Sequence, residues 1–424
     1  MVFAHANWRK PTLRTLDRPS IFLAGALSAL LILWVFFFLS TPFQPTTCSC
    51  TRPDPAFNLQ FDPPVSTFYD DPSFGYTLDT RITNYDFKRQ TWLKLHPSFQ
   101  PKSGTRVLIV TGTRSTPCKS RTGDHFLLRF YRNKVDYCRI HGYDIFYNNV
   151  LLDPKMPSCW AKIPTVRAAM VAHPEAEWIW WLDEDAAFTD MEFKIPFEKY
   201  KDYNFIVHGW PREVYERKSW LGLNAGSFLI RNCQWSLDFL DSWADMGPRS
   251  ANFGKWAGVL SDVFRHESDD QTALGYLLLK DHQKWFGKKM LIETGYYLEG
   301  YWVSIVDTLK NITERYLEIE TTAAMLRRRH AEKVSERYGV LREPSLKDAG
   351  NEFGSWRRPF VTHFAGCQPC NGKHNPLFTG EGCRDAMNKA LNFADNQVLR
   401  NYGFVHRNLS DTSGVSPLPF DYPV

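Results

Sequence analysis

A run of five apolar residues, Trp178–Leu182, leads directly into three acidic residues at 183–185. The run is continuous rather than alternating, which is typical of a strand whose two faces are both covered by helices. Ahead of it, the strand-like segments 107–111 and 144–147 are separated by the helix-like stretch 124–141. This alternation predicts an α/β sheet, and such sheets bind ligands beyond the carboxyl ends of their strands. The acidic residues are therefore predicted to lie at a binding site.

The chain after this run mixes shorter segments. Apolar residues spaced three or four apart through a charge-rich stretch predict one long amphipathic helix over 312–341. Residues 222–227, Gly-Leu-Asn-Ala-Gly-Ser, predict a tight turn with backbone amides near a ligand. No G-x-G-x-x-G, P-loop or G-x-S-x-G motif occurs, so dinucleotide-binding, kinase-type and serine-hydrolase functions lack support. The other expected elements are helices at 164–170, 235–243 and 272–279 and strands at 204–207 and 360–364.

Asp183 and Asp185 form a candidate metal site. Two carboxylates one residue apart at the exit of a buried strand supply the hard oxygen ligands that Mg²⁺ and Mn²⁺ prefer. Such an ion would neutralise the charge that develops as a nucleoside diphosphate leaves, which is the chemistry that glycosyl transfer needs. Acidic triplets are also common in surface turns, but the position directly after five apolar residues favours the metal site.

Two further groups of residues have more than one interpretation. Asp269, Asp270 and Gln271 precede a helix-like segment, so they fit either a helix N-cap or a rigid platform that grips sugar hydroxyls. His363 lies in a strand-like run, where a histidine on its own is more often a buried core residue than a ligand.

The amino-terminal region predicts a membrane anchor. Residues 20–39 form a run of about twenty uncharged residues, the length that a helix needs to cross a bilayer. A cleaved signal peptide would be shorter and would end in small residues, whereas this run ends in Phe-Phe-Phe-Leu. Basic residues precede the run, which predicts a single-pass type II protein whose later residues are luminal. The predicted parts are a tail at 1–19, an anchor at 20–40, a stem at 41–95 and a catalytic domain at 96–424.

The distribution of charge excludes one class of partner. Much of the formal charge of +5 belongs to the basic tail, and the rest of the chain is close to neutral. No dense basic stripe remains to contact a phosphate backbone, so nucleic acid is not an expected partner.

Nine cysteines in a luminal chain predict some disulfides and at least one free thiol. The candidates, with their pairing left open, are Cys118, Cys138, Cys367, Cys370 and Cys383. The last three could instead form half of a zinc site with His374, although the lack of a second C-x-x-C pair disfavours zinc. Two sequons predict glycosylation at Asn311 and Asn408.

Longer segments resemble a known family. They include GDHFLLRFYRNKVDYCRIHGYDIFYNN at 123–149, WIWWLDEDAAFTDMEF at 178–193, SDDQTALGYL at 268–277 and THFAGCQPCNG at 362–372. These segments are similar to the plant galactomannan galactosyltransferases and xyloglucan xylosyltransferases, which are retaining enzymes of the GT-A fold. The run RRRHAEKVSERYG at 327–339 resembles the galactomannan branch more closely. The resemblance implies a Rossmann-like nucleotide-binding half at about 96–200 fused to an acceptor-binding half at about 201–424.

The resemblance also implies a reaction and a location. The reaction is transfer of α-galactose from UDP-galactose to O6 of mannose in a β-1,4-mannan backbone, with retention of configuration. Mn²⁺ is the implied metal and Mg²⁺ its alternative. The implied location is the Golgi membrane, and the expected acceptor is a mannan or galactomannan polysaccharide. A further expected partner is a second copy of the chain or another polysaccharide enzyme of the Golgi, with which it would form an oligomer.

Individual residues take roles from the same resemblance. Asp183 and Asp185 match the D-x-D metal site, and His363 matches the histidine that completes it. Asp270 and Gln271 match the catalytic pair near the anomeric carbon, where Gln271 is expected to stabilise developing positive charge. Nucleotide or diphosphate contacts are expected from Gly112, Thr113, Lys134, Trp160 and Lys162, and sugar contacts from Asn224, Gly226, Asp269 and Trp302.

Two positions depart from the family's pattern. Glu184 stands at the centre of the D-x-D, where the family usually has Ser, and it adds a negative charge close to the diphosphate site. Gln368 stands where the xylosyltransferases have a Lys near the phosphates, and Lys373 is the candidate substitute. Both departures bear on metal affinity and donor geometry.

Two other functions fit the sequence. One keeps the enzyme class but uses UDP-xylose and a β-glucan acceptor. The other is a non-catalytic Golgi subunit that presents the fold and the 312–341 helix to a polysaccharide synthase. Comparing donors under the same conditions separates the first from galactosyl transfer, and binding without turnover would favour the second.

Overall fold

In the computed structural model the chain falls into two units, Met1–Asp62 and Pro63–Val424. Each unit is described on its own. The structure describes residues 27–28, 30–34, 68–99, 105–251, 253–254, 257–262, 268–280, 285, 289–329, 336–350, 355–411, 414–419 and 421–422.

The structure contradicts the predicted membrane anchor, and with it the single-pass type II Golgi location. Among the residues that the structure describes, no helix combines the length and the apolar character needed to cross a bilayer. Residues 27–28 and 30–34 of the predicted anchor are helical. The rest of the predicted anchor and the tail at 1–19 lie outside the described residues.

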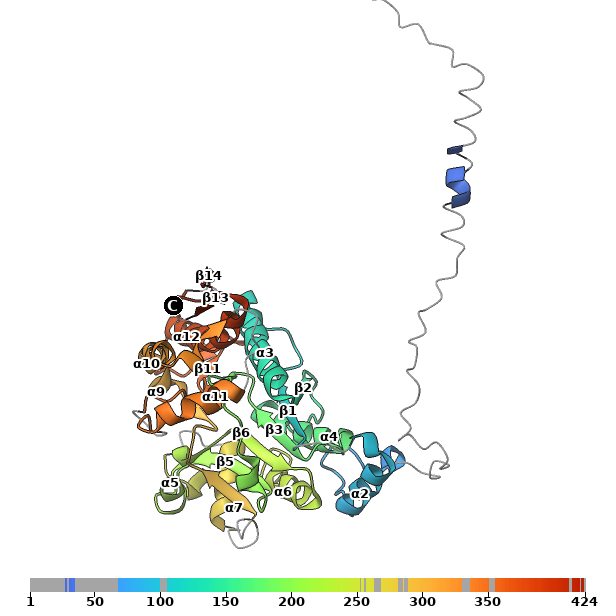
Figure 1. The fold of residues 1–424 in the computed structure, drawn as a ribbon. Helices are drawn as coiled ribbons and strands as arrows, with labels where there is room; N and C mark the ends of the chain where they lie inside the picture. The colour runs from blue at the N-terminus through green and yellow to red at the C-terminus, as the bar shows by residue number, and fades with distance from the viewer. Residues whose placement is uncertain are drawn as a thin grey trace, which may run out of the picture. The chain divides into compact units, whose positions relative to one another are not determined.

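A six-stranded sheet forms the centre of the second unit, with the strand order β2-β1-β3-β6-β5-β7 (Figure 1). The strands β1, β2 and β3 are parallel, β6 is antiparallel to both β3 and β5, and β7 is parallel to β5. The sheet is therefore mixed α/β, as predicted. Its strands are β1 (Val107–Gly112), β2 (Asp144–Asn148), β3 (Trp178–Leu182), β5 (Phe205–Gly209), β6 (Leu223–Arg231) and β7 (Met290–Glu293).

Helices cover both faces of this sheet, which explains why β3 is apolar at every position. Ile179 and Trp181 pack into one core, whereas Trp178, Trp180 and Leu182 pack into the other. The first core lies against α4 (Lys162–Ala172), α6 (Gln234–Ala244) and α7 (Asp270–Lys280), and the second lies against α3 (Arg121–His141). Successive side chains of a strand point to opposite faces, so each face receives alternate residues.

A three-stranded sheet in the order β4-β10-β8 completes the edge where β3 ends. Strand β4 (Ala186–Phe188) pairs antiparallel with β10 (Val361–His363), and β10 pairs parallel with β8 (Gly300–Tyr301). Ala186 is the register partner of His363, although the two residues are 177 positions apart in the sequence. This small sheet therefore brings a distant histidine beside the acidic residues that follow β3.

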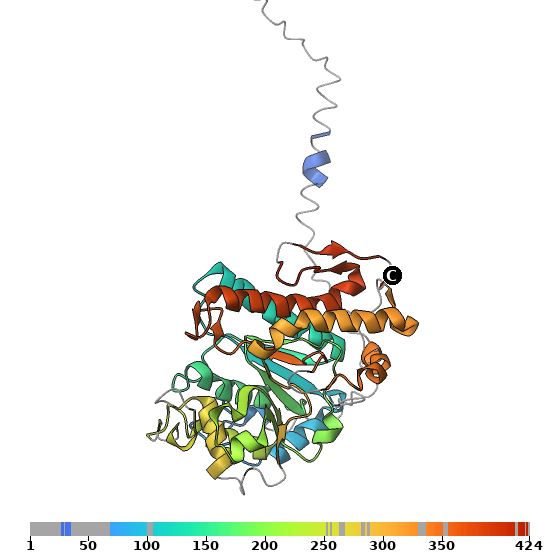
Figure 2. The same ribbon diagram turned by 90° about the vertical axis from the view of Figure 1, so that its left-hand side faces the viewer.

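Long helices pack beyond the small sheet. Helix α3 begins at the cap Ser120, whose hydroxyl accepts a hydrogen bond from the Gly123 amide, and ends at Gly142, which has a positive φ. Helices α12 (Gly380–Leu399) and α10 (Leu309–Thr322) lie side by side (Figure 2). The remaining elements are α2 (Tyr85–Leu95), α5 (Pro211–Tyr215), α9 (Trp302–Ile305), α11 (Glu336–Arg342), β9 (Arg328–Arg329), β11 (Cys367–Gln368), β12 (Lys373–His374), β13 (Phe404–Val405), β14 (Ser416–Pro417) and β15 (Asp421–Tyr422).

The predicted long helix over 312–341 is wrong. Helix α10 ends at Thr322, and Ala323 after it has an extended backbone. The hydroxyls of Thr321 and Thr322 donate to carbonyls four residues back, a bond that weakens a helix. A 3-10 helix follows at Ala324–Leu326, and after it come β9, which pairs with β15, and α11. The spacing of apolar residues did not reveal where α10 ends, because apolar residues on both sides of that point are buried in the core.

The predicted tight turn at 222–227 is also wrong, because Leu223–Arg231 is strand β6. This strand is buried along most of its length, and its side chains fill both cores. The sequence misled because Asn224 and Gly226 resemble turn residues, whereas a central strand uses glycine where another group comes very close.

Residues 68–99 belong to the second unit, which begins at Pro63 rather than at residue 96. The hydroxyl oxygen of Tyr85, on α2, lies 2.5 Å from Met170 O and 2.9 Å from Asn232 Oδ1, and it can donate a hydrogen bond to either. The buried Arg167 pairs with Asp241 and also donates to carbonyls of this segment. These contacts hold 68–99 against α4 and α6.

A buried ion-pair network, called the arginine network below, joins α10, α11 and the end of α12. Glu320 Oε1 lies 2.8 Å from Arg342 Nη2, and Arg342 also pairs with Glu192. Arg358 Nη1 lies 3.2 Å from Glu192 Oε2, and Arg400 Nη1 lies 3.5 Å from Glu320 Oε2. Each of these five side chains is at most 6% exposed, so their charges are neutralised by one another and not by water.

Candidate active site

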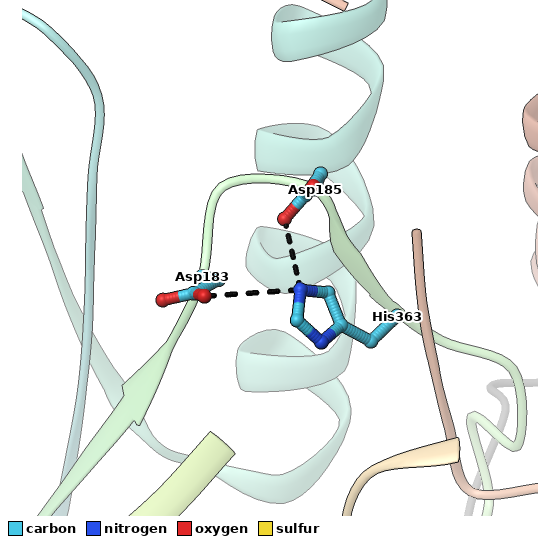
Figure 3. A group of neighbouring side chains, drawn as sticks. All are labelled: Asp183, Asp185 and His363. Atoms are coloured by element: carbon cyan, nitrogen blue, oxygen red, sulfur yellow. Dashed lines mark ion pairs between the residues drawn. The ribbon is translucent and has the colours of Figure 1, made fainter. Parts of the chain in front are cut away.

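Asp183, Asp185 and His363 come together at the carboxyl edge of the central sheet (Figure 3). His363 Nε2 lies 3.2 Å from Asp185 Oδ1 and 3.7 Å from Asp183 Oδ2. One ligand atom from each residue can be chosen so that all lie within 4.8 Å of one another. Two carboxylate oxygens and an imidazole nitrogen at this spacing can hold a divalent cation.

Backbone hydrogen bonds fix the two aspartates. The Asp183 amide donates to Gly226 O at 2.8 Å, which ties the end of β3 to β6. The Phe364 amide donates to Asp185 O at 3.1 Å, which ties the turn after β3 to the residue after β10. The aspartates thus sit in a short turn that is tied on both sides to strands of the fold.

The second ring nitrogen of His363 contacts a residue that sequence reasoning missed. His363 Nδ1 lies 3.0 Å from Glu299 Oε1, and both side chains are buried. Burial opposes a charge on the ring, but Asp185 and Glu299 together raise the pKa of His363 well above its usual value. No motif marks Glu299, because its contact with His363 spans 64 positions of sequence.

Lys162 links the cluster of Asp183, Asp185 and His363 to Asp270. Its Nζ lies 3.1 Å from Asp183 Oδ1 and 2.7 Å from Asp270 Oδ2, and it donates to Ala225 O at 2.9 Å. Burial alone would lower the pKa of Lys162, but Asp183 and Asp270 raise it above its usual value, so the side chain is a cation. Two ion pairs and one hydrogen bond thus hold the ammonium group.

Glu184 points toward the ends of β1 and β2. Burial raises its pKa to about 7, while the hydroxyl of Thr113 and the charge of Lys134 oppose that rise. Burial lowers the pKa of Lys134 to about 8, and its Nζ donates to Ala186 O at 2.6 Å and to Glu184 O at 3.2 Å. Lys134 therefore stabilises the turn between β3 and β4 through carbonyl groups.

The sequence profile of the galactosyl transferase GMA12/MNN10 family matches residues 103–374. The chain belongs to this family. Galactomannan galactosyltransferase 1 of Cyamopsis tetragonoloba is 52% identical over 424 residues, which cover 95% of this chain and 95% of that protein. Glycosyltransferase 6 of Arabidopsis thaliana is 54% identical over 415 residues, which cover 95% of this chain and 94% of that protein. The protein is therefore a glycosyltransferase, and the resemblance seen in the sequence is confirmed.

The likeness to solved structures is much weaker. A galactosyltransferase solved with donor and acceptor sugar analogues is 11% identical and aligns with a TM-score of 0.30, covering 66% of this chain and 95% of that one. A likeness at this level carries no argument about this glycosyltransferase.

The expected catalytic pair lies at the start of α7. Gln271 Oε1 accepts from the Ala225 amide at 3.2 Å, and Gln271 Nε2 donates to Trp220 O at 3.0 Å. Burial raises the pKa of Asp270, and the nearby Lys162 opposes that rise. Contacts with Lys162 and β6 thus hold the two residues next to the cluster of Asp183, Asp185 and His363.

Asp269 takes the helix-cap role that the sequence offered as one interpretation. Its Oδ1 accepts from the Thr272 amide at 2.7 Å and from the Thr272 hydroxyl at 2.6 Å. The same oxygen lies 3.3 Å from Trp220 Nε1. Contact with a sugar stays a prediction for Asp269.

The other expected contact residues are spread around the cluster. Asn224 Oδ1 accepts from the Gly226 amide at 2.7 Å, so these two residues support each other on β6. Gly112 ends β1, where a Cβ would come 2.6 Å from Asn148 O. Trp302 donates to Ala365 O, two residues after His363.

Trp160 is placed by its packing. It is 3% exposed, and a Cβ on Gly247 would come 2.8 Å from its ring, which also packs against Phe253. The structure thus gives Trp160 a place in the core. Its expected contact with the diphosphate stays a prediction.

Disulfides resolve the role of the cysteine-rich segment. Cys118 pairs with Cys370 and Cys367 pairs with Cys383, so the alternative of a zinc site is wrong. Cys138 is buried with a free thiol, and burial raises its pKa to about 12. The pairing joins the segment before α3 to the segment after His363.

The remaining predicted positions are on the surface. Asn311 lies exposed on α10, and Asn408 is exposed after β13, so glycosylation of both stays a prediction. Gln368 and Lys373 are exposed and pair in register on β11 and β12 as Gln368↔Lys373. Their part in phosphate binding also stays a prediction.

Proposed function

We propose that this glycosyltransferase transfers galactose from UDP-galactose to O6 of mannose in a β-1,4-mannan backbone, with retention of configuration. The observation that carries the proposal is the convergence of Asp183, Asp185 and His363 beside Asp270 and Gln271. The name of the Cyamopsis relative supports galactose and mannan as the sugars. We also propose that the domain is of the GT-A type, with its nucleotide half at about 96–200 and its acceptor half at about 201–424.

The residues of the cluster fit a divalent cation. Asp183 and Asp185 lie together with His363, and Lys162 joins Asp183 to Asp270. An imidazole nitrogen beside two carboxylates favours Mn²⁺ over Mg²⁺, because Mg²⁺ prefers oxygen ligands. When bound, the ion supplies Lewis-acid stabilisation of the leaving diphosphate.

The chain's own residues then hold the reacting sugar. Lys162 pairs with Asp270 and fixes it, so that the free lone pairs of its carboxylate can accept hydrogen bonds from sugar hydroxyls. Gln271 Oε1 uses one lone pair for the Ala225 amide and has a second for the positive charge that develops at the anomeric carbon. Asp270 and Gln271 are thus the proposed catalytic residues.

The deciding experiment is transfer by the purified chain given UDP-galactose, Mn²⁺ and mannan oligosaccharides, with UDP-xylose and cello-oligosaccharides run in parallel. The expected product is mannan carrying α-linked galactose, identified by linkage analysis. Transfer of xylose to the glucan acceptor would replace the proposed substrates, and UDP binding without turnover on either acceptor would favour a non-catalytic subunit.

A further inference from the structure

Glu299 contacts the proposed metal ligand His363 from the side opposite to the aspartates. Its Oε1 lies 3.0 Å from His363 Nδ1, whereas Nε2 faces Asp183 and Asp185. Glu299 is 3% exposed and His363 is 5% exposed. The imidazole is therefore held between carboxylates on both of its nitrogens.

The hydrogen bond to Glu299 determines which nitrogen can bind a metal. An ionised carboxylate only accepts hydrogen bonds, so the Nδ1 proton is committed to Glu299. A metal ion would therefore take the place of the proton on Nε2, the nitrogen directed at Asp183 and Asp185. A ring free to turn would lose this alignment.

A second element limits movement of the same ring. A Cβ on Gly226 would come 2.4 Å from His363 Cε1 and 2.7 Å from His363 Nδ1. The backbone of β6 thus packs directly on the imidazole, and Glu299 supplies the polar anchor that packing alone cannot. Glu299 directly precedes β8, the parallel neighbour of β10, so the anchor and the ring belong to one small sheet.

We infer that Glu299 is a positioning residue that fixes the ring orientation and the tautomer of His363 for metal binding. This inference rests on the proposed metal role of Asp183, Asp185 and His363. Partners of this kind in known metal sites change metal affinity by about ten- to a hundredfold when they are removed.

The test measures Mn²⁺ affinity of the full-length protein with MnCl₂ alone, by electron paramagnetic resonance, for Glu299→Ala and Glu299→Gln. The matched control is Glu293→Gln, since Glu293 is a carboxylate 1% exposed that bonds Lys199 and Tyr200 instead of His363. Pulsed measurements on protein labelled with ¹⁵N-histidine report whether a histidine nitrogen stays bound to Mn²⁺. Thermal unfolding of each variant shows that it is folded.

The expected result is a rise in the dissociation constant for Mn²⁺ of about tenfold or more in Glu299→Ala, with the histidine signal reduced. Glu299→Gln is expected to fall between it and the wild type, because an amide oxygen can still accept the Nδ1 proton. This variant carries the test if Glu299→Ala does not fold. The control is expected to bind Mn²⁺ like the wild type.

Two results would overturn the inference alone: wild-type affinity and histidine signal in both Glu299 variants while Asp185→Ala loses Mn²⁺, or an equal loss in the Glu293→Gln control. A wild-type protein that binds no Mn²⁺ would overturn the proposed metal site and this inference together. The Asp185→Ala variant thus separates failure of the inference from failure of the proposed function.

Discussion

The acidic cluster at the sheet edge and the arginine network both place several charges out of water, yet they differ in balance. In the arginine network, Arg342, Arg358 and Arg400 surround Glu192 and Glu320. Burial raises the pKa of the neighbouring Asp190, and Arg358 and Arg342 oppose that rise. Positive and negative groups there are matched within the protein.

The acidic cluster is unbalanced in the other direction. Its cationic groups are Lys134, Lys162 and His363, and its carboxylates are those of Asp183, Glu184, Asp185, Asp270 and Glu299. Buried charges without partners are costly. A network whose charges match stabilises the fold, whereas a cluster with excess negative charge is suited to a cation that arrives with the substrate.

The largest expected effect comes from Asp185→Asn. Because this change removes a proposed metal ligand, transfer is expected to fall about a thousandfold, which corresponds to roughly 4 kcal/mol. The free energy of unfolding should fall by far less than the activity: burial raises the pKa of Asp185, but the ion pair with His363 lowers it below its usual value, so only that one pair is lost. The initial rate at saturating UDP-galactose measures activity, and urea unfolding measures stability. A loss of stability as large as the loss of activity, both in kcal/mol, would contradict the proposed difference between the acidic cluster and the arginine network.

Glu192→Gln is the converse test in the arginine network. It leaves Arg342 and Arg358 without their shared carboxylate, and breaking a buried ion pair costs about 3 kcal/mol or somewhat more. Urea unfolding should show that loss, while Mn²⁺ affinity of the folded protein stays unchanged. If Mn²⁺ affinity fell in parallel, the network would belong to the functional site.

Lys162→Met tests whether this lysine positions carboxylates or binds phosphate. All three of its acceptors belong to the protein, so kcat is expected to fall about a hundredfold, roughly 2.7 kcal/mol, as Asp270 loses its partner. KM for UDP-galactose should change little. A rise in KM with kcat preserved would instead support direct phosphate contact.

Gly226→Ala has a smaller expected effect. The new methyl group would meet the His363 ring, so the ring must shift and Mn²⁺ affinity should drop about tenfold, or roughly 1.4 kcal/mol. Titration calorimetry with MnCl₂ measures it. Gly258→Ala serves as the control, because a Cβ there meets no atom within 4 Å, and it should bind Mn²⁺ normally.

Glu293→Gln gives the smallest effect and a pH dependence. Burial would raise the pKa of Glu293, but hydrogen bonds from Lys199 and Tyr200 lower it below its usual 4.5. A lowered carboxyl pKa stabilises the folded state above pH 4.5, and that stability is lost as the pH falls through the folded value. The variant should therefore be less stable than the wild type by about 1 kcal/mol at pH 7, with the difference shrinking in acid. If the difference in stability between the variant and the wild type stayed the same at low pH, the lowered pKa of Glu293 would be contradicted.

Much of the fold could be predicted from local sequence. The all-apolar run at 178–182 is β3 as predicted, and the expected helix at 124–141 is most of α3. These elements form because each one's own residues carry the pattern, whether continuous burial of a strand or the spacing of a helix face. The long helix at 312–341 failed because that spacing continued across a break in the backbone.

The candidate site divides in the same way. Its acidic residues stand out in the sequence because three carboxylates follow a buried strand at once. The place of His363 came from family resemblance, since a histidine in a strand gives no local sign of its partners. Glu299, the bridging role of Lys162 and the pairing of the four bonded cysteines were beyond both kinds of reasoning.

The sequence by itself determined the α/β class, most strands of the parallel half and the acidic edge, because burial and periodicity are properties of neighbouring residues. Only the tertiary structure decided which nitrogen of His363 faces the aspartates, which carboxylates share Lys162 and which buried charges are matched. Those outcomes depend on contacts between residues far apart in the chain, such as the pairing of Ala186 with His363, and no local pattern encodes a distance across the fold.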